Sequence, residues 1–173
     1  MDRAEFSVLG EPVPRPRQRH RILTKPNGTQ IVVNYTPARH PVNRYKAEIQ
    51  AAARTAWRLV AGPVMTLEPV QLRVCFVFPR LASTPKRASP GRLPYTSPRG
   101  DVDNLLKALQ DAMIGIVYRD DGQIVRCMAE RWRAAIGEAA ATHVIVERIG
   151  EAEMRQLDDR SRVKFPPILT DGE

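Results

Sequence analysis

The stretch VQLRVCFVF at residues 70–78 constrains the fold more than any other part of the sequence. Apolar and polar residues alternate in its first half, and its second half is a continuous apolar run, a pattern that predicts a β-strand. A shorter alternation predicts a strand at residues 5–9, which Gly10 closes. Two more strands are expected at about residues 123–133 and 142–148. The chain therefore contains enough strands for a sheet.

Apolar residues recur at helical spacing in two other places. They predict one helix over about residues 43–60, capped by Asn43 and ended by Gly62-Pro63, and a second over about residues 102–116. The dipeptide Asn27-Gly28 lies between two apolar runs and predicts a β-hairpin. Together these elements predict an α/β (α+β) fold, in which a mixed β-sheet packs with two main helices in a single domain.

Two segments fall outside this regular pattern. Residues 79–100 are rich in Pro, Ser, Arg and Gly and show no periodicity. A loop of this length inside a compact domain is usually functional or disordered, and its position directly before Asp101 favours a function. Beyond Gly150 the sequence becomes polar. We therefore expect a folded domain over residues 1–150 and a polar C-terminal tail over residues 151–173.

The distribution of charge indicates an anionic partner. The net charge is +8, yet residues 12–46 contain eight Lys or Arg and no acid, and residues 69–100 contain six more and again no acid. Basic segments beside a separate acidic cluster are expected where phosphates are drawn to a metal site. A generic basic surface is the alternative, although such a surface does not need clustered carboxylates.

The basic residues of these two segments are the candidate nucleic-acid contacts. Prolines keep the chain around residues 12–16 extended, and in an extended chain alternate side chains point the same way, about 6.5–7 Å apart. Four arginines in this arm could therefore match successive phosphates, although a merely solvated arm would look the same. The predicted DNA-binding residues of the arm and the loop are Arg15, Arg17, Arg19, Arg21, Lys86, Arg87 and Arg99.

Other features of the composition point to a cytoplasmic protein. No stretch approaches the ~20 apolar residues of a membrane span. The first residues lack the charged-then-apolar layout of a signal peptide. Cys75 and Cys127 are too few for a disulfide scaffold and match no zinc motif, so we expect two reduced thiols in the core.

The chemistry is expected where acidic residues cluster. Asp101 and Asp103 can both face one ion if Asp101 lies at the cap of the second helix, and that helix end favours negative charge. Lys107 lies one turn beyond Asp103, where it can pair with Asp103, orient a water or neutralise a phosphate. After the helix, Asp120-Asp121 occupies a turn. A few carboxylates are what Mg²⁺ binds, and their combination suggests metal-assisted attack on a phosphodiester. Singly, each feature is also an ordinary cap, ion pair or turn.

At these positions the sequence resembles a known family. The run DVDNLLKALQDAMIG from residue 101 and YRDDGQI from residue 118 match the pattern D-x-D-N-x-x-K-x-x-x-D-A followed by D-D-x-Q-[IV]. This pattern is typical of the RusA family of Holliday junction resolvases, and the resemblance extends over about residues 5–148. It implies a RusA-like fold and cleavage of four-way DNA junctions by a homodimer that uses Mg²⁺ or Mn²⁺. Many members of the family are encoded by prophages.

The resemblance also implies roles for individual residues. The metal-binding carboxylates would be Asp101, Asp103 and Asp121, with Asp120 able to share the role, and the essential lysine would be Lys107. Family members often carry Lys-Pro directly before the first aspartate, whereas this chain has Arg99-Gly100. The charge is kept there, but the rigidity of proline is lost.

The expected mechanism is metal-activated attack of water in line on phosphorus, with Lys107 balancing the charge that develops on the phosphate. Two alternatives stay open on the residues alone. One is a metal-dependent nuclease that acts on another branched DNA or on RNA, because fold and motif do not fix the substrate. The other is a non-catalytic nucleic-acid-binding protein in which the carboxylates are structural.

Overall fold

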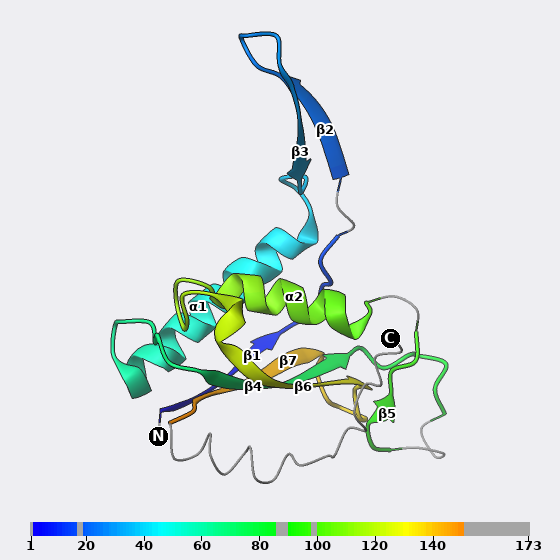
Figure 1. The fold of residues 1–173 in the computed structure, drawn as a ribbon. Helices are drawn as coiled ribbons and strands as arrows, with labels where there is room; N and C mark the ends of the chain where they lie inside the picture. Colours follow the sequence, from blue (N-terminus) through cyan, green and yellow to red (C-terminus); the bar gives the residue numbers. More distant parts are fainter. Residues whose placement is uncertain (1, 17–18, 86–89, 98–99, 151–173) are drawn as a thin grey trace, which may run out of the picture.

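The computed structural model describes residues 2–16, 19–85, 90–97 and 100–150. A five-stranded sheet in the order β1-β7-β4-β6-β5 forms the base of the molecule (Figure 1). The β4 and β6 strands are parallel, and the other neighbouring pairs are antiparallel, so the sheet is mixed as expected. Its strands are β1 (Arg3–Leu9), β4 (Val70–Phe78), β5 (Leu93–Pro94), β6 (Ile124–Arg133) and β7 (Ala141–Arg148).

Two helices cover one face of this sheet, α1 (Pro41–Ala61) and α2 (Val102–Met113) (Figure 1). Because side chains alternate along a strand, the even-numbered residues of β4 and residues 142, 144 and 146 of β7 face these helices and are buried. The buried residues of α1 recur every three or four positions, from Val42 to Trp57, and form the matching stripe. This packing confirms the predicted α+β fold, with one core between the sheet and the two helices.

The α2 helix lies in the connection between the parallel strands β4 and β6. Parallel neighbours cannot be joined by a tight turn, so the chain must cross from one end of the sheet to the other. The crossover contains the loop after β4, the short strand β5, α2 and the 3₁₀ helix η1 (Asp121–Gln123). As a result, both halves of the acidic motif belong to this single crossover.

The predicted hairpin forms the separate two-stranded sheet of β2 (Arg19–Thr24) and β3 (Gln30–Tyr35). It projects from the body of the molecule beyond α1 and α2 (Figure 1). Asn27-Gly28 forms its tip, where Gly28 adopts a φ of +82° that favours glycine. In the described part of the chain, no helix is long and apolar enough to cross a membrane.

Several predicted boundaries need correction. The cap of α1 is His40, whose Nδ1 accepts the Val42 N–H, and Pro41 supplies the first helical residue; Asn43 lies inside the helix. The α2 helix ends at Met113, before residue 116, because Gly115 turns the chain with a φ of +75°. The β5 strand, which pairs with β6, was not predicted within residues 79–100.

The expected core position of both cysteines is wrong. Cys75 occupies an odd-numbered position of β4 and therefore lies on the face of the sheet that the helices leave uncovered. Cys127 is exposed on β6. The predicted boundary between domain and tail at residue 150 stays a prediction, because residues 151–173 lie outside the described residues.

Candidate active site

The first turn of α2 presents two carboxylates to solvent. Asp101 is the N-cap residue of the helix, as predicted, and its carbonyl oxygen accepts the Leu105 N–H at 3.0 Å. Asp103 lies in the first turn, and both side chains are exposed. Neither carboxylate makes a hydrogen bond or an ion pair with any other described residue. The helix N-terminus favours negative charge, yet neither side chain accepts a capping hydrogen bond from the helix backbone. Both carboxylates therefore remain available to a ligand.

Lys107 lies one turn further along α2 and pairs with two other carboxylates. Its ammonium group donates to Asp121 and lies 3.4 Å from Asp111. The hydrogen bond to Asp121 raises the pKa of Lys107, and the same bond lowers the pKa of the Asp121 carboxyl. Both groups are therefore charged at neutral pH. The sequence left open a pairing of Lys107 with Asp103, but Lys107 pairs with Asp121 and Asp111.

The turn after α2 explains why Asp121, and not its neighbour, reaches Lys107. The Asp120 carboxylate accepts the Gly122 N–H at 2.8 Å and so caps η1. The Gln123 side chain accepts the Asp120 N–H and donates to the carbonyl oxygens of Thr66 and Glu68. This capping box fastens the turn to the chain before β4. Asp121 is consequently held on the side that faces α2.

Three cations from three segments surround Asp111. Its carboxylate lies 3.1 Å from the Lys46 ammonium of α1, 3.4 Å from Lys107 and 3.8 Å from the Arg15 guanidinium. Arg15 is also fixed through its backbone, because its N–H donates to the Asn104 carbonyl at 3.0 Å. Asp111 thus ties the N-terminal segment and α1 to the helix that carries Lys107.

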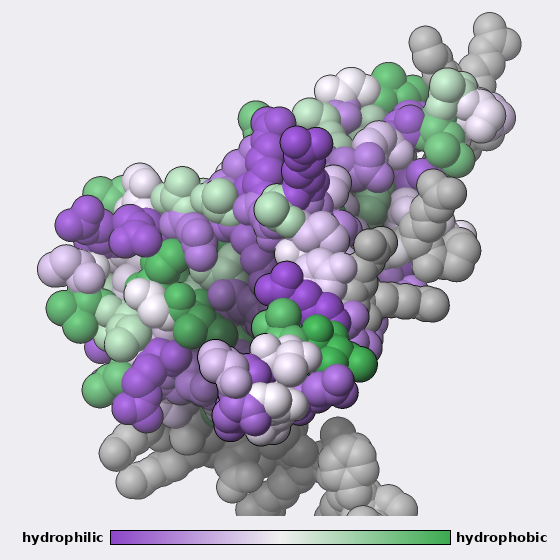
Figure 2. Space-filling model, turned by 90° about the horizontal axis from the view of Figure 1, so that it is seen from above, coloured by the Kyte–Doolittle hydropathy of each residue, from purple (hydrophilic) through white to green (hydrophobic). Residues whose placement is uncertain are grey.

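An open cavity of about 470 Å³ lies beside these contacts, along α2 from Asp103 to Gln110. Its lining combines a carboxylate, an ammonium and a guanidinium, supplied by Asp103, Lys107 and Arg15. Seen from above the helices, this side of the molecule is predominantly hydrophilic, with separate hydrophobic patches (Figure 2). An anionic group could meet two cations here beside a carboxylate that has no described partner.

Comparison with known proteins assigns the chain. The model of the endodeoxyribonuclease RusA family matches residues 10–147, which is most of the sequence. The chain belongs to the RusA family. It is also similar to the uncharacterized protein YqaN of Bacillus subtilis (strain 168), with 32% identity over 130 residues, which cover 72% of this chain and 84% of YqaN. The matched range contains residues 101–124, in which the RusA-like motif lies.

Gly100 explains how this RusA-family chain does without the proline that often precedes the first aspartate. Gly100 has a φ of +73°, which proline cannot adopt because its ring fixes φ near −65°. The Arg131 guanidinium of β6 donates to the Gly100 carbonyl at 2.8 Å. Arg131 also lies over the Tyr95 ring, which stacks on Phe78 at 3.9 Å between centroids. A hydrogen bond from the sheet therefore fixes the entry to α2.

The structure places only part of the predicted DNA-binding set. Arg15 lies at the cavity, and Arg21 lies on the hairpin with its guanidinium 5.5 Å from the centre of the Tyr35 ring. Arg19 begins β2. The remaining four residues lie outside the described residues, namely Arg17, Lys86, Arg87 and Arg99. Their predicted role stays a prediction.

The donor chemistry of the RusA motif suits a hard divalent cation, since Asp101, Asp103 and Asp121 supply carboxylate oxygens. Within the described ranges, however, no three His, Cys, Asp or Glu side chains are grouped closely enough to hold a metal ion. Asp121 is instead paired with Lys107. The metal-binding role of these three residues and of Asp120 therefore stays a prediction.

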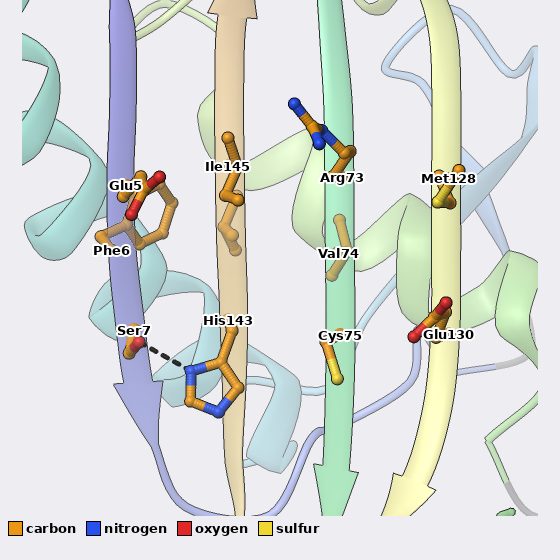
Figure 3. A pocket seen from close by; sticks show the side chains of 11 residues that line it. Glu5, Phe6, Ser7, Arg73, Val74, Cys75, Met128, Glu130, His143 and Ile145 are labelled. Atoms are coloured by element: carbon orange, nitrogen blue, oxygen red, sulfur yellow. Dashed lines mark hydrogen bonds between the residues drawn. The ribbon is translucent and has the colours of Figure 1, made fainter.

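Two residues of the site were not assigned a role from the sequence. Asp111 lies four residues after Lys107, so helical spacing could have revealed their pairing. Arg131 gave no local signal, because its contact with Gly100 joins residues 31 positions apart. A second hollow, of about 440 Å³, lies on the uncovered face of the sheet, where Ser7 and His143 are hydrogen-bonded at 2.8 Å (Figure 3). None of the predicted site residues lines it.

Proposed function

We propose that this RusA-family protein is a metal-dependent, structure-selective endodeoxyribonuclease that resolves Holliday junctions by paired symmetric cuts. The observation that carries the proposal is the cavity in which Asp103, Lys107 and Arg15 meet, with Asp121 bonded to Lys107. Cations that bind phosphate and carboxylates that suit Mg²⁺ are thus combined at one helix end. Family membership supports endonuclease activity on DNA.

Asp101 and Asp103 would hold Mg²⁺ or Mn²⁺, and Asp121 would be the third carboxylate. A bound divalent ion would supply an activated water and stabilise the leaving oxygen. Asp121 is a better candidate than Asp120, because Asp120 already accepts the Gly122 N–H that caps η1. The role of Asp120 would then be to hold Asp121 in place.

Lys107 would bind the scissile phosphate as a cation. Its raised pKa keeps the ammonium protonated well above neutral pH, so the positive charge is present throughout the working range. Its partner Asp121 shares this charge in the absence of substrate. Arg15 lines the same cavity and offers a second cation whose planar donors suit phosphate oxygens. The Lys107 ammonium and the Arg15 guanidinium would both stabilise the extra negative charge of the transition state.

Paired cuts require two such sites. A four-way junction is resolved by cuts on two strands of like polarity, which are related by a two-fold axis. Each chain carries one acidic motif, so a homodimer with two-fold symmetry places two identical sites in that relation. The proposed partner set is therefore four-way junction DNA and a second copy of this chain.

The deciding experiment adds Mg²⁺ to an end-labelled four-way junction, with a linear duplex of the same sequence as the control. We expect symmetric nicks on opposing strands of the junction and no cuts in the duplex. Equal cutting of flaps, other branched DNA or RNA would show that the enzyme is not selective for four-way junctions. Binding without any cut, in Mg²⁺ or Mn²⁺, would reduce the protein to a nucleic-acid-binding module.

A further inference from the structure

The β2–β3 hairpin extends away from the core of the domain. Its strands have six residues each, so the ribbon is about 20 Å long. It projects past the helices without packing on the sheet (Figure 1). The tip is an ordered turn in which the Lys25 N–H donates to Thr29 and the Gly28 N–H donates to Lys25. A two-stranded ribbon gains little stability by itself, so its length calls for a partner.

Charge identifies the class of partner. The ribbon contains Arg19, Arg21 and Lys25 and no acidic residue, and the surrounding segment is free of acids from residue 12 to residue 46. An acid-free basic element of this kind attracts a polyanion. It would repel a basic protein surface, including a second copy of itself.

The register of the ribbon places an apolar pair on one face. Ile22 lies directly opposite Val32, and the side chains are 64% and 66% exposed. The other face carries a second apolar pair, Leu23 opposite Ile31, of which Leu23 is 37% exposed. Arg21 and Tyr35 lie on the same face, with the Arg21 guanidinium over the Tyr35 ring. A nucleic acid is a polyanion that also accepts apolar contacts, because its bases offer methyl groups and unstacked faces between the phosphates.

The root of the ribbon lies at the candidate active site. Arg15, bonded to α2 through its backbone, precedes β2 by only four residues, so the ribbon begins within about 13 Å of the cavity. On its other side the ribbon leads to His40, which caps α1. A ligand that reaches both the cavity and the ribbon tip must therefore be an extended polymer.

We propose that the β2–β3 ribbon lies in a groove of one duplex arm of the DNA substrate, with Ile22 and Val32 towards the bases and the cations towards the phosphates. The major groove, about 12 Å wide, admits a two-stranded ribbon. The inference rests on the proposed function only in taking DNA as the substrate. It assigns the ribbon to the duplex arm next to the cut. A ribbon of about 20 Å would cover about six base pairs of that arm at 3.4 Å per step.

Two double variants of the full chain separate the two kinds of contact. Arg21→Gln with Lys25→Gln should make the slope of log affinity against log salt shallower by about 1.8, because each phosphate that a cation neutralises accounts for about 0.9 of the slope. Ile22→Thr with Val32→Thr should weaken binding about tenfold at each salt concentration, with the slope unchanged. Threonine keeps the strand preference, so the ribbon should persist.

The matched controls are Arg58→Gln and Leu59→Gln at the far end of α1, about 30 Å from the ribbon. Leu59 is 82% exposed, so both changes remove surface groups of the same kinds. Junction affinity should be unchanged in both. A wild-type footprint needs no variant: bases should be protected over about six base pairs of one arm beside the cut.

Two results would overturn the ribbon proposal without contradicting the proposed nuclease function. One is an unchanged affinity and salt slope in both double variants, and the other is a footprint that protects phosphates but no bases. Conversion of a dimer to a monomer by Ile22→Thr with Val32→Thr would show that the apolar pair is a subunit contact. Tighter binding to an A-form RNA duplex, whose major groove is too narrow, would also overturn the proposal. A wild-type protein that binds the junction but does not cut it would contradict the proposed function alone.

Discussion

The ammonium group of Lys107 is bonded to the carboxylate of Asp121, 14 residues further along the chain. This bond joins the exposed side of α2 to the turn that follows the helix, so it connects two parts of the crossover between β4 and β6. It also places the one basic residue of the motif against one of its three proposed metal ligands. A metal ion that binds the Asp121 carboxylate must displace the Lys107 ammonium. A substrate phosphate could then replace Asp121 as the anionic partner of Lys107.

We predict that Lys107→Met raises the pKa of Asp121 towards its ordinary value of 3.8, because the bond from Lys107 is the main cause of the depression. In the native protein, the stabilisation from Asp121 is present above that ordinary value and is lost as pH falls through the lower folded pKa. NMR titration of the carboxyl carbon measures the shift. Arg44→Met, which removes an exposed pair with Glu48, is the control and should leave Asp121 unchanged.

On the alkaline side the sign is reversed. The pKa of Lys107 is raised above 10.5, so its contribution to stability is present below 10.5 and is lost as pH rises through the folded value. The free energy of unfolding of the wild type relative to Lys107→Met should therefore be constant across neutral pH. A difference that changed between pH 6 and 8 would mean that another group, and not this ion pair, controls it.

Asp103→Asn is expected to reduce junction cleavage to below about a tenth of the wild-type rate, because a proposed metal ligand loses its charge. Junction binding should be equal or tighter, since a negative charge beside the phosphate disappears. Gel-shift and single-turnover cleavage assays on the same junction separate the two effects. Glu130→Gln, on the uncovered face of the sheet, is a matched loss of charge and should cleave normally. Cleavage by Asp103→Asn above a tenth of the wild-type rate would remove Asp103 from the ligand set.

Asp111→Asn should destabilise the fold by roughly 1–3 kcal/mol, because three cations lose a carboxylate that is only 21% exposed. Chemical denaturation measures the loss. A double-mutant cycle with Lys46→Met should give coupling between the two positions, since their charged groups lie 3.1 Å apart. Additive effects would mean that Asp111 acts through Arg15 or Lys107 and that α1 is not fastened by this contact.

The oligomeric state follows from the need for two cuts. Light scattering of the intact protein should give a mass near twice 19.5 kDa at micromolar concentration. A junction with one cleavable strand should be nicked once, and the intact junction should be nicked twice in one binding event. A monomer both free and on junction DNA would favour a single-cut nuclease.

The elements that depend on local chemistry were predictable. Asp101 was placed at a helix cap because residues two apart cannot share a helical face, and the hairpin followed from Asn27-Gly28. The cap of α1 differs from the predicted Asn43, because His40 caps the helix and Pro41, a common first helical residue, begins it.

Contacts between distant segments were not predictable. The sequence indicated that Lys107 and the acidic residues converge, but the choice of Asp121 as its partner depends on the Asp120–Gln123 capping box and its bonds to the chain before β4. The two-residue strand β5 exists only because β6 lies beside it. Likewise, Cys127 resembles a core residue until the register of β6 is known.

Gly100 bears on protein engineering. A designer who averaged the family would place the frequent proline before Asp101 and expect a stiffer chain. In this molecule the ring would force φ from +73° to about −65° and turn the carbonyl away from Arg131. The guanidinium that now holds the start of α2 would lose its acceptor. Proline at position 100 would thus loosen the start of α2 in this chain, although its ring restricts the backbone locally.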